Sequence, residues 1–135
     1  PGTTELPLTA ALARDPRVRY VPALHECTVV AAADGYAMAG RRLGVVNLHS
    51  SCGLGNGMGM LVNAHAAGTT LLVTAGQQDT RHLFDEPVLA GPLVDMARPL
   101  TKYAAEVRRV EDLPNAVRRA VQAALTAPTG PVFLS

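Results

Sequence analysis

Apolar and polar residues follow one another in blocks along the chain, and these blocks predict alternating strands and helices. Two nearly continuous apolar runs, residues 43–49 and 69–75, are typical of strands that are buried on both faces of a sheet. A shorter run of the same kind covers residues 131–134. Residues 111–127 are predicted to form an amphipathic helix, because apolar residues recur in them at four-residue spacing. These residues are Leu113, Val117, Val121 and Leu125.

The N-terminal part of the chain is predicted to contain two further helices and a short strand. The first helix spans residues 5–14, with Thr3 or Thr4 as its N-cap. Polar and apolar residues alternate over residues 17–22, which indicates a strand. The second helix runs from about residue 26 to residue 39 and ends at the glycine that follows.

Buried strands that alternate with helices predict an α/β domain with a parallel sheet. Residues 77–99 are the least regular part, and residues 101–107 are expected to form one more strand. A Pro-Gly pair usually follows a structural element, yet here it opens the chain, and the last strand has no tail. We therefore expect the chain to be a fragment of a longer protein.

Composition excludes several classes of function. The 135 residues are 48% hydrophobic and 17% charged, as in a globular domain. Twelve Lys and Arg residues balance eleven Asp and Glu residues, which gives no support for a nucleic-acid or membrane-surface partner. No apolar run approaches the roughly 20 residues of a membrane helix. Cys27 and Cys52 lack metal-site spacing, and we expect them to be reduced, buried thiols of a cytoplasmic protein.

A glycine-rich stretch follows the strand at residues 43–49, in the order strand, glycines, helix. Such an order is typical of sites where backbone N–H groups bind an anion. The alternating glycines do not match the GxGxxG pattern, however, so close backbone packing is favoured over a dinucleotide site. The glycines are Gly53, Gly55, Gly57 and Gly59.

Two side chains are the strongest candidates for chemistry. Glu26 begins a helix that is otherwise apolar until Asp34. It either interacts with the helix dipole or is a carboxylate whose protonation is used. His49 stands at the carboxyl end of a buried strand, where parallel sheets bind ligands, although a structural role is also open. No two of the four histidines have metal-ligand spacing. Ser50 and Ser51 lack the sequence context of a hydrolase nucleophile.

The whole chain resembles the pyrimidine-binding domain of thiamine-diphosphate enzymes, and within that family the benzoylformate decarboxylase branch. The helix that begins with glutamate is specific to the family, and the Asn-Leu-His-Ser segment points to the decarboxylase branch. The segments that carry the resemblance are residues 1–7, 25–26, 33–37, 47–50, 53–59, 74–78, 98–102 and 128–135.

The resemblance implies a three-layer αβα fold with a mostly parallel central sheet that lacks the first strand and helix of the family domain. It implies that Glu26 bonds the aminopyrimidine ring of thiamine diphosphate and that His49 moves protons to or from the reacting group. Thr3 falls where the branch has a serine that contacts the substrate carboxylate. Pro1 and Gly2 match positions close to the cofactor. The motif that binds the diphosphate and Mg²⁺ in this family lies on another domain and is absent here.

The resemblance also implies a reaction. It is the non-oxidative decarboxylation of a small, benzoylformate-like 2-oxo acid to an aldehyde and CO2. Residues 1–135 would be the N-terminal pyrimidine-binding domain, inactive alone, within a homo-oligomer, dimer or tetramer, assembled through this domain. An acetolactate synthase-like carboligase and a non-catalytic scaffold that pairs subunits stay open as alternatives. For Glu26, apolar neighbours are expected to disfavour the charged form.

Overall fold

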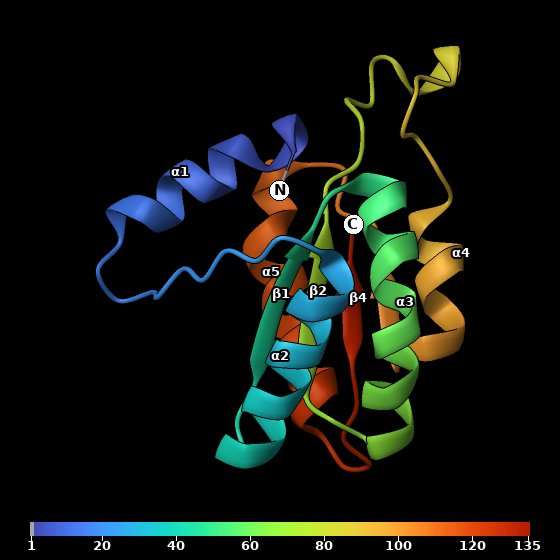
Figure 1. Cartoon of the computed structure of the whole chain (residues 1–135). Helices are drawn as coiled ribbons and strands as arrows, with labels where there is room; N and C mark the ends of the chain where they lie inside the picture. Colours follow the sequence, from blue (N-terminus) through green and yellow to red (C-terminus); the bar gives the residue numbers. More distant parts are fainter. Residues whose placement is uncertain (1) are drawn as a thin grey trace.

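A computed structural model describes residues 2–135 as a sheet of four strands with helices on both faces (Figure 1). None of the helices in this range is long and apolar enough to cross a membrane. The elements in chain order are η1 (Thr3–Glu5), α1 (Leu6–Arg14), α2 (Glu26–Gly40), β1 (Gly44–Leu48), α3 (Ser50–Ala67), β2 (Leu71–Ala75), η2 (Leu83–Asp85), α4 (Leu93–Ala97), η3 (Arg98–Leu100), β3 (Tyr103–Ala105), η4 (Val110–Asp112), α5 (Leu113–Leu125) and β4 (Val132–Leu134).

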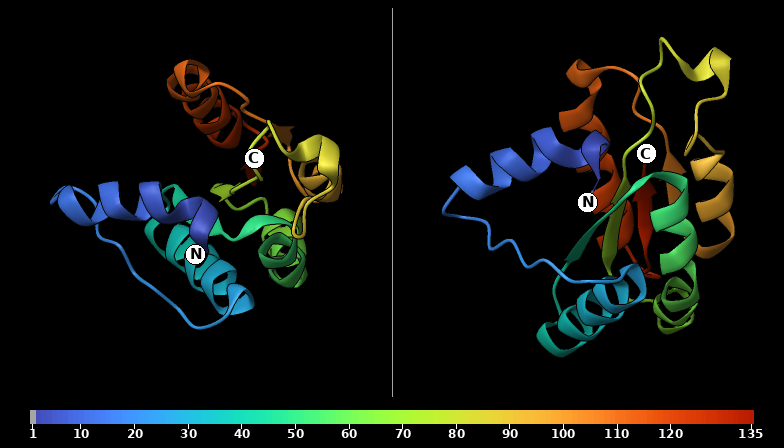
Figure 2. Two further views of the ribbon diagram at one scale, coloured as in Figure 1. Left: turned by 90° about the horizontal axis from the view of Figure 1, so that it is seen from above. Right: turned by 45° about the horizontal axis from the view of Figure 1, so that its top comes forward.

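The sheet is entirely parallel and has the order β1-β2-β4-β3. Helices α2, α3 and α4 cover one face, and α5 covers the other, so the fold has three layers (Figures 1 and 2). The predicted α/β class and parallel sheet are thereby confirmed. All four strands predicted from residue 43 onward are present, each shortened by one to four residues.

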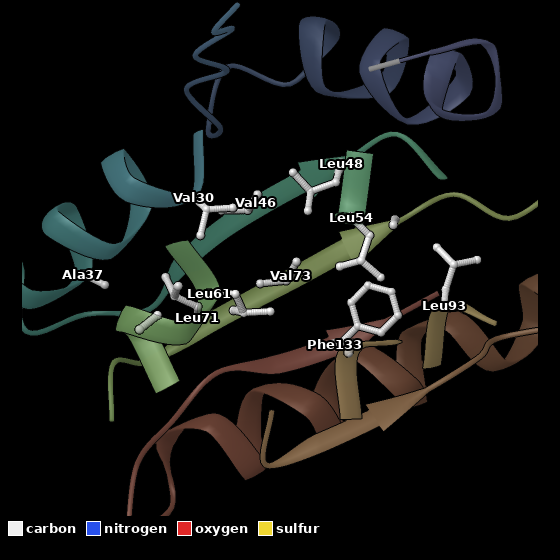
Figure 3. Close-up of a cluster of buried hydrophobic side chains, with 13 residues drawn as sticks. Val30, Ala37, Val46, Leu48, Leu54, Leu61, Leu71, Val73, Leu93 and Phe133 are labelled. Carbon is white, nitrogen blue, oxygen red and sulfur yellow. The ribbon is translucent and has the colours of Figure 1, made fainter. Parts of the chain in front are cut away.

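Alternate residues of the central strands point into two separate cores, as the period of a strand requires. Val73 of β2 and Phe133 of β4 face the α2–α3–α4 side, whereas Leu72 and Val132 face α5. The Phe133 ring is fully buried and lies near Leu54 of α3 in the larger core (Figure 3). Because both faces of β2 and β4 are covered, these strands read as nearly continuous apolar runs in the sequence.

Helices α2 and α3 lie side by side over β1 and β2 (Figures 1 and 2). Gly57 allows this approach, since a Cβ atom there would lie 3.1 Å from a Val30 methyl group and 3.2 Å from a Leu48 methyl group. Close packing thus explains this glycine, as predicted. It does not explain Gly59, around which a Cβ atom would meet nothing within 4 Å.

Three local predictions were wrong. The stretch Gly53–Gly59 is not a loop, because α3 begins directly after β1 at Ser50 and includes all four glycines. Thr3 and Thr4 do not cap a helix through their side chains. The thiols are not buried: Cys52 is exposed and Cys27 is half-buried, although both are free. Glycine in a helix costs only about 1 kcal/mol relative to alanine, which tertiary packing readily offsets.

Residues 17–22 were also predicted wrongly, because they form no strand. A strand exists only with a backbone partner, and this segment runs along the outside of the fold with its apolar side chains exposed (Figure 2). The outer edge of β1 likewise has no partner strand within residues 2–135. The prediction that residues 43–49 are buried on both faces was therefore wrong for β1: Val45 is 63% exposed, because α5 packs mainly against β2, β4 and β3.

Candidate active site

The candidate site lies where β1 and β2 end, at the carboxyl edge of the sheet. His49 directly follows β1, and Gly76 directly follows β2. Ser50, the first residue of α3, is fully buried and has a φ of 45°, so the chain turns sharply out of the strand. This left-handed conformation is rare for a residue other than glycine, and such strain is found mostly at functional sites. The turn leaves the His49 side chain at the edge where parallel sheets bind ligands.

Glu26 is placed by the start of α2. The helix begins at Glu26, because the Nδ1 atom of His25 accepts a hydrogen bond from the backbone N–H of Cys27 at 3.2 Å. Glu26 is half-buried as a residue, and its carboxylate points toward α3, where Asn56 donates a hydrogen bond of 3.2 Å to Oε2. Its Oε1 atom lies beside Gly53.

Gly53 is the point that Glu26 and His49 share. A Cβ atom on this glycine would lie 3.3 Å from Cβ of His49 and 3.4 Å from Oε1 of Glu26. The structure therefore brings together the two residues that were predicted to act, although 23 positions separate them in the sequence. Position 53 therefore places no side chain between the two.

The surroundings of Glu26 differ from the apolar enclosure that the sequence suggested. Val30 is buried, but Ala31 is exposed, and Asn56 gives the carboxylate a polar neighbour. An apolar sequence around a helical residue does not enclose it, because neighbours in sequence point around the helix.

The N-terminal residues contribute unequally. A Cβ atom on Gly2 would lie 2.1 Å from Cε1 of the His49 ring, so the Gly2 backbone packs directly on the imidazole. Thr3 is exposed in η1. Pro1 was predicted to bind the cofactor, and it lies outside the described residues.

Glu5 is the residue that the sequence did not reveal. Its side chain is 2% exposed and accepts hydrogen bonds from several donors. Oε2 accepts from the Gly2 N–H at 2.8 Å and lies 2.8 Å from Nδ1 of His49. Oε1 accepts from the Gly76 N–H at 3.0 Å and from the Thr4 hydroxyl. A glutamate in the first turn of a helix has an ordinary dipole explanation, and only the long-range contacts to His49 and Gly76 distinguish it.

The Glu5 carboxyl group is held in its ionised form. Burial acts to raise its pKa, but the hydrogen bonds from Thr4, Gly2 and His49, together with the charge of His49, outweigh burial and hold the pKa below its ordinary value. A buried carboxylate is tolerated when its oxygens are satisfied in this way.

The site fits the pyrimidine end of thiamine diphosphate. The carboxylate of Glu26 accepts one bond from Asn56 at Oε2, and Oε1 lies beside Gly53, where a ring nitrogen can donate to it. Within residues 2–135 no group of three or more His, Cys, Asp or Glu side chains is arranged to hold a metal ion.

Known proteins resemble this chain over its full length. The sequence model of the family described as thiamine pyrophosphate enzyme, N-terminal TPP binding domain, matches residues 1–90. A benzoylformate decarboxylase of Pseudomonas aeruginosa is 42% identical over 100% of this chain and 25% of its own length. A mitochondrial acetolactate synthase of Schizosaccharomyces pombe is 31% identical over 99% of this chain and 20% of its own length.

Solved structures agree with these relatives. The benzoylformate decarboxylase of Polynucleobacter necessarius superposes with a TM-score of 0.92 at 43% identity, over 100% of this chain and 25% of that one. The thiamine diphosphate-dependent 4-hydroxybenzoylformate decarboxylase of Rhodococcus jostii gives a TM-score of 0.94 at 37% identity, with coverage of 100% and 25%. The chain thus spans about a quarter of the length of these relatives. With the match over residues 1–90, these similarities show that the chain belongs to the thiamine pyrophosphate enzymes and has the fold of their pyrimidine-binding domain.

Proposed function

We propose that this chain supplies the pyrimidine-binding half of the active site in a thiamine diphosphate-dependent decarboxylase of 2-oxo acids. The observation that carries the proposal is the convergence of Glu26 and His49 on Gly53 at the carboxyl edge of the sheet. When bound, thiamine diphosphate supplies the carbon nucleophile that adds to the 2-oxo carbon and the electron sink that makes loss of CO2 possible.

Glu26 would hold and activate the cofactor through one hydrogen bond. A carboxylate that accepts a hydrogen bond from the N–H of a ring nitrogen stabilises the ring form in which that nitrogen carries the proton. Asn56 keeps Oε2 occupied, and the other oxygen, Oε1, is left for this bond. Gly2 would approach the cofactor with its backbone.

His49 would move the proton that decarboxylation requires. After CO2 leaves, the carbon that carried it takes up a proton before the aldehyde is released. An imidazole at the edge of the sheet is suited to donate it, because its ring nitrogens can take up a proton and pass it on. Thr3 is exposed at the start of η1, next to Gly2, and its hydroxyl would contact the carboxylate of the substrate.

An aryl substrate, such as benzoylformate, is the choice favoured by the names of the decarboxylase relatives. Mg²⁺ and the diphosphate would be held by a further domain, and the chain would form a homo-oligomer through this one. Helices α2 and α3 each expose a large apolar side chain, Tyr36 (57%) and Val62 (48%), that such an interface could cover.

The test is the substitution Glu26→Gln in the full-length protein. We expect the exchange of the C2 proton of bound thiamine diphosphate for deuterium to slow by orders of magnitude, because the amide cannot accept the ring proton in the same way. Glu111→Gln makes the same chemical change at an exposed position and serves as the control. Exchange at the wild-type rate in Glu26→Gln would refute the assigned role.

The mitochondrial acetolactate synthase of Schizosaccharomyces pombe matches 99% of the chain, so a carboligase is the second candidate. Product analysis with a 2-oxo acid separates the two: a decarboxylase releases one aldehyde per CO2, whereas a carboligase joins two carbon skeletons. Failure of the full-length protein to bind thiamine diphosphate in calorimetry would instead favour the scaffold.

A further inference from the structure

The carboxylate of Glu5 links three segments that are distant in sequence. It lies under the His49 ring at the end of β1, against the backbone N–H of Gly76 at the end of β2, and against the N–H of Gly2. The residue is only 3% exposed, so water has little access to it. Such a carboxylate sets the orientation of every donor that surrounds it.

The contact with His49 fixes which ring nitrogen carries the proton. An ionised carboxylate can only accept hydrogen bonds, and Oε2 lies 2.8 Å from Nδ1 of His49. Nδ1 therefore donates to Glu5. In the neutral imidazole the other nitrogen, Nε2, is then unprotonated, and it has no hydrogen-bond partner within residues 2–135.

Two glycines hold this arrangement in place. A Cβ atom on Gly76 would lie 2.1 Å from Oε1 of Glu5, and one on Gly2 would lie 2.3 Å from Nδ1 of His49. Both backbones therefore lie in contact with the pair, one on the carboxylate and the other on the ring. An alanine at position 76 would push the carboxylate away without changing its charge.

We propose that Glu5 is a positioning residue that keeps Nδ1 of His49 protonated and so makes Nε2 the atom that exchanges protons with the substrate. The proposal rests on the function proposed above for His49. Glu5 itself does not contact the reacting group; it acts through the imidazole.

The experiment measures the tautomer of His49 directly. ¹⁵N-histidine spectra of the full-length protein, with His49 assigned by its loss in His49→Ala, should show the wild-type ring protonated at Nδ1. In Glu5→Gln and in Gly76→Ala we expect a large share of the Nε2-protonated form, and Glu111→Gln should match wild type. A wild-type tautomer in both Glu5→Gln and Gly76→Ala would overturn the proposal, and the second variant covers the case in which the first does not fold.

Turnover separates the two proposals. We expect Glu5→Gln to lower kcat by about 10–100-fold, below the full 10²–10⁴-fold contribution of an acid–base group, and to have no further effect when added to His49→Ala. If Glu5→Gln lowered kcat by the same factor with and without His49, the positioning role of Glu5 would be contradicted, whereas the proposed role of His49 would not. An unchanged kcat in His49→Ala would instead contradict the proposed function of His49.

Discussion

Glu5→Gln provides a test of the site that needs no substrate, because the carboxylate is also a structural link. Its two oxygens accept hydrogen bonds from the N–H groups of Gly2 and Gly76, one on each oxygen. In glutamine one of these oxygens becomes an NH2 group. Whichever way the amide is turned, one backbone N–H then faces another donor.

The expected loss of stability follows from the one backbone N–H group that loses its acceptor. A buried donor left without an acceptor costs about 1–3 kcal/mol, and the remaining bonds lose the strength that a charged acceptor gives them. We expect the free energy of unfolding at pH 7 to fall by about 2–4 kcal/mol. Urea unfolding of wild-type and variant protein, compared at unchanged m-value, measures this difference.

The pH dependence has a definite sign. The pKa of Glu5 in the folded state lies below its ordinary value of 4.5, so the ionised form stabilises the fold. That contribution is complete above about pH 4.5 and is lost as the pH falls through the folded-state pKa. The stability gap between wild type and Glu5→Gln should therefore be constant near neutrality and narrow in acid. A variant as stable as wild type, or a gap that persists unchanged into strong acid, would refute the reasoning.

Four further substitutions test the packing and one pair of hydrogen bonds. Gly44→Ala should destabilise the fold by about 2–3 kcal/mol, because the new Cβ atom would lie 2.8 Å from the carbonyl oxygen of Ala33. Gly59→Ala should instead stabilise the helix by about 0.5–1 kcal/mol, because a Cβ atom there would meet nothing within 4 Å. Chemical denaturation measures the free energy of unfolding of both variants. Phe133→Ala should cost about 3–5 kcal/mol, visible as a lower Tm, since the ring is fully buried. Lys102→Met should lower Tm by removing two hydrogen bonds of 2.6 Å to carbonyl groups at the end of α5, worth about 1–2 kcal/mol together; an unchanged Tm would show that these bonds contribute nothing.

Sequence patterns predicted those helices and strands whose side chains are buried in a regular pattern along the segment. The strands β2 and β4 were predictable because both of their faces are covered, which leaves a nearly continuous apolar run. Residues 17–22 have the alternating pattern of a strand but form none, because no other strand pairs with them. The sequence of that segment alone cannot show that the partner strand is missing. The start of α3 was missed because four glycines suggest a loop, although packing against α2 and β1 holds them in a helix.

The candidate site was predictable only in part, for a similar reason. Glu26 and His49 could be selected because each stands at the end of an element. Glu5 could not, because its role depends on a contact with His49 across 44 positions and with Gly76 across 71. A sequence shows that a carboxylate is present, but the donors that surround it are assembled only by the fold.

Within residues 2–135 no strand pairs with the outer edge of β1, and this affects how the purified chain can be handled. With Val45 exposed, its free backbone groups form a template to which any extended segment can add, including the same edge of another copy. The solubility of the purified chain therefore depends on its concentration and on whether another segment pairs with that edge. A lysine at position 45 would oppose edge-to-edge association by charge repulsion while leaving the candidate site untouched, so Val45→Lys is the background in which the site variants are best compared.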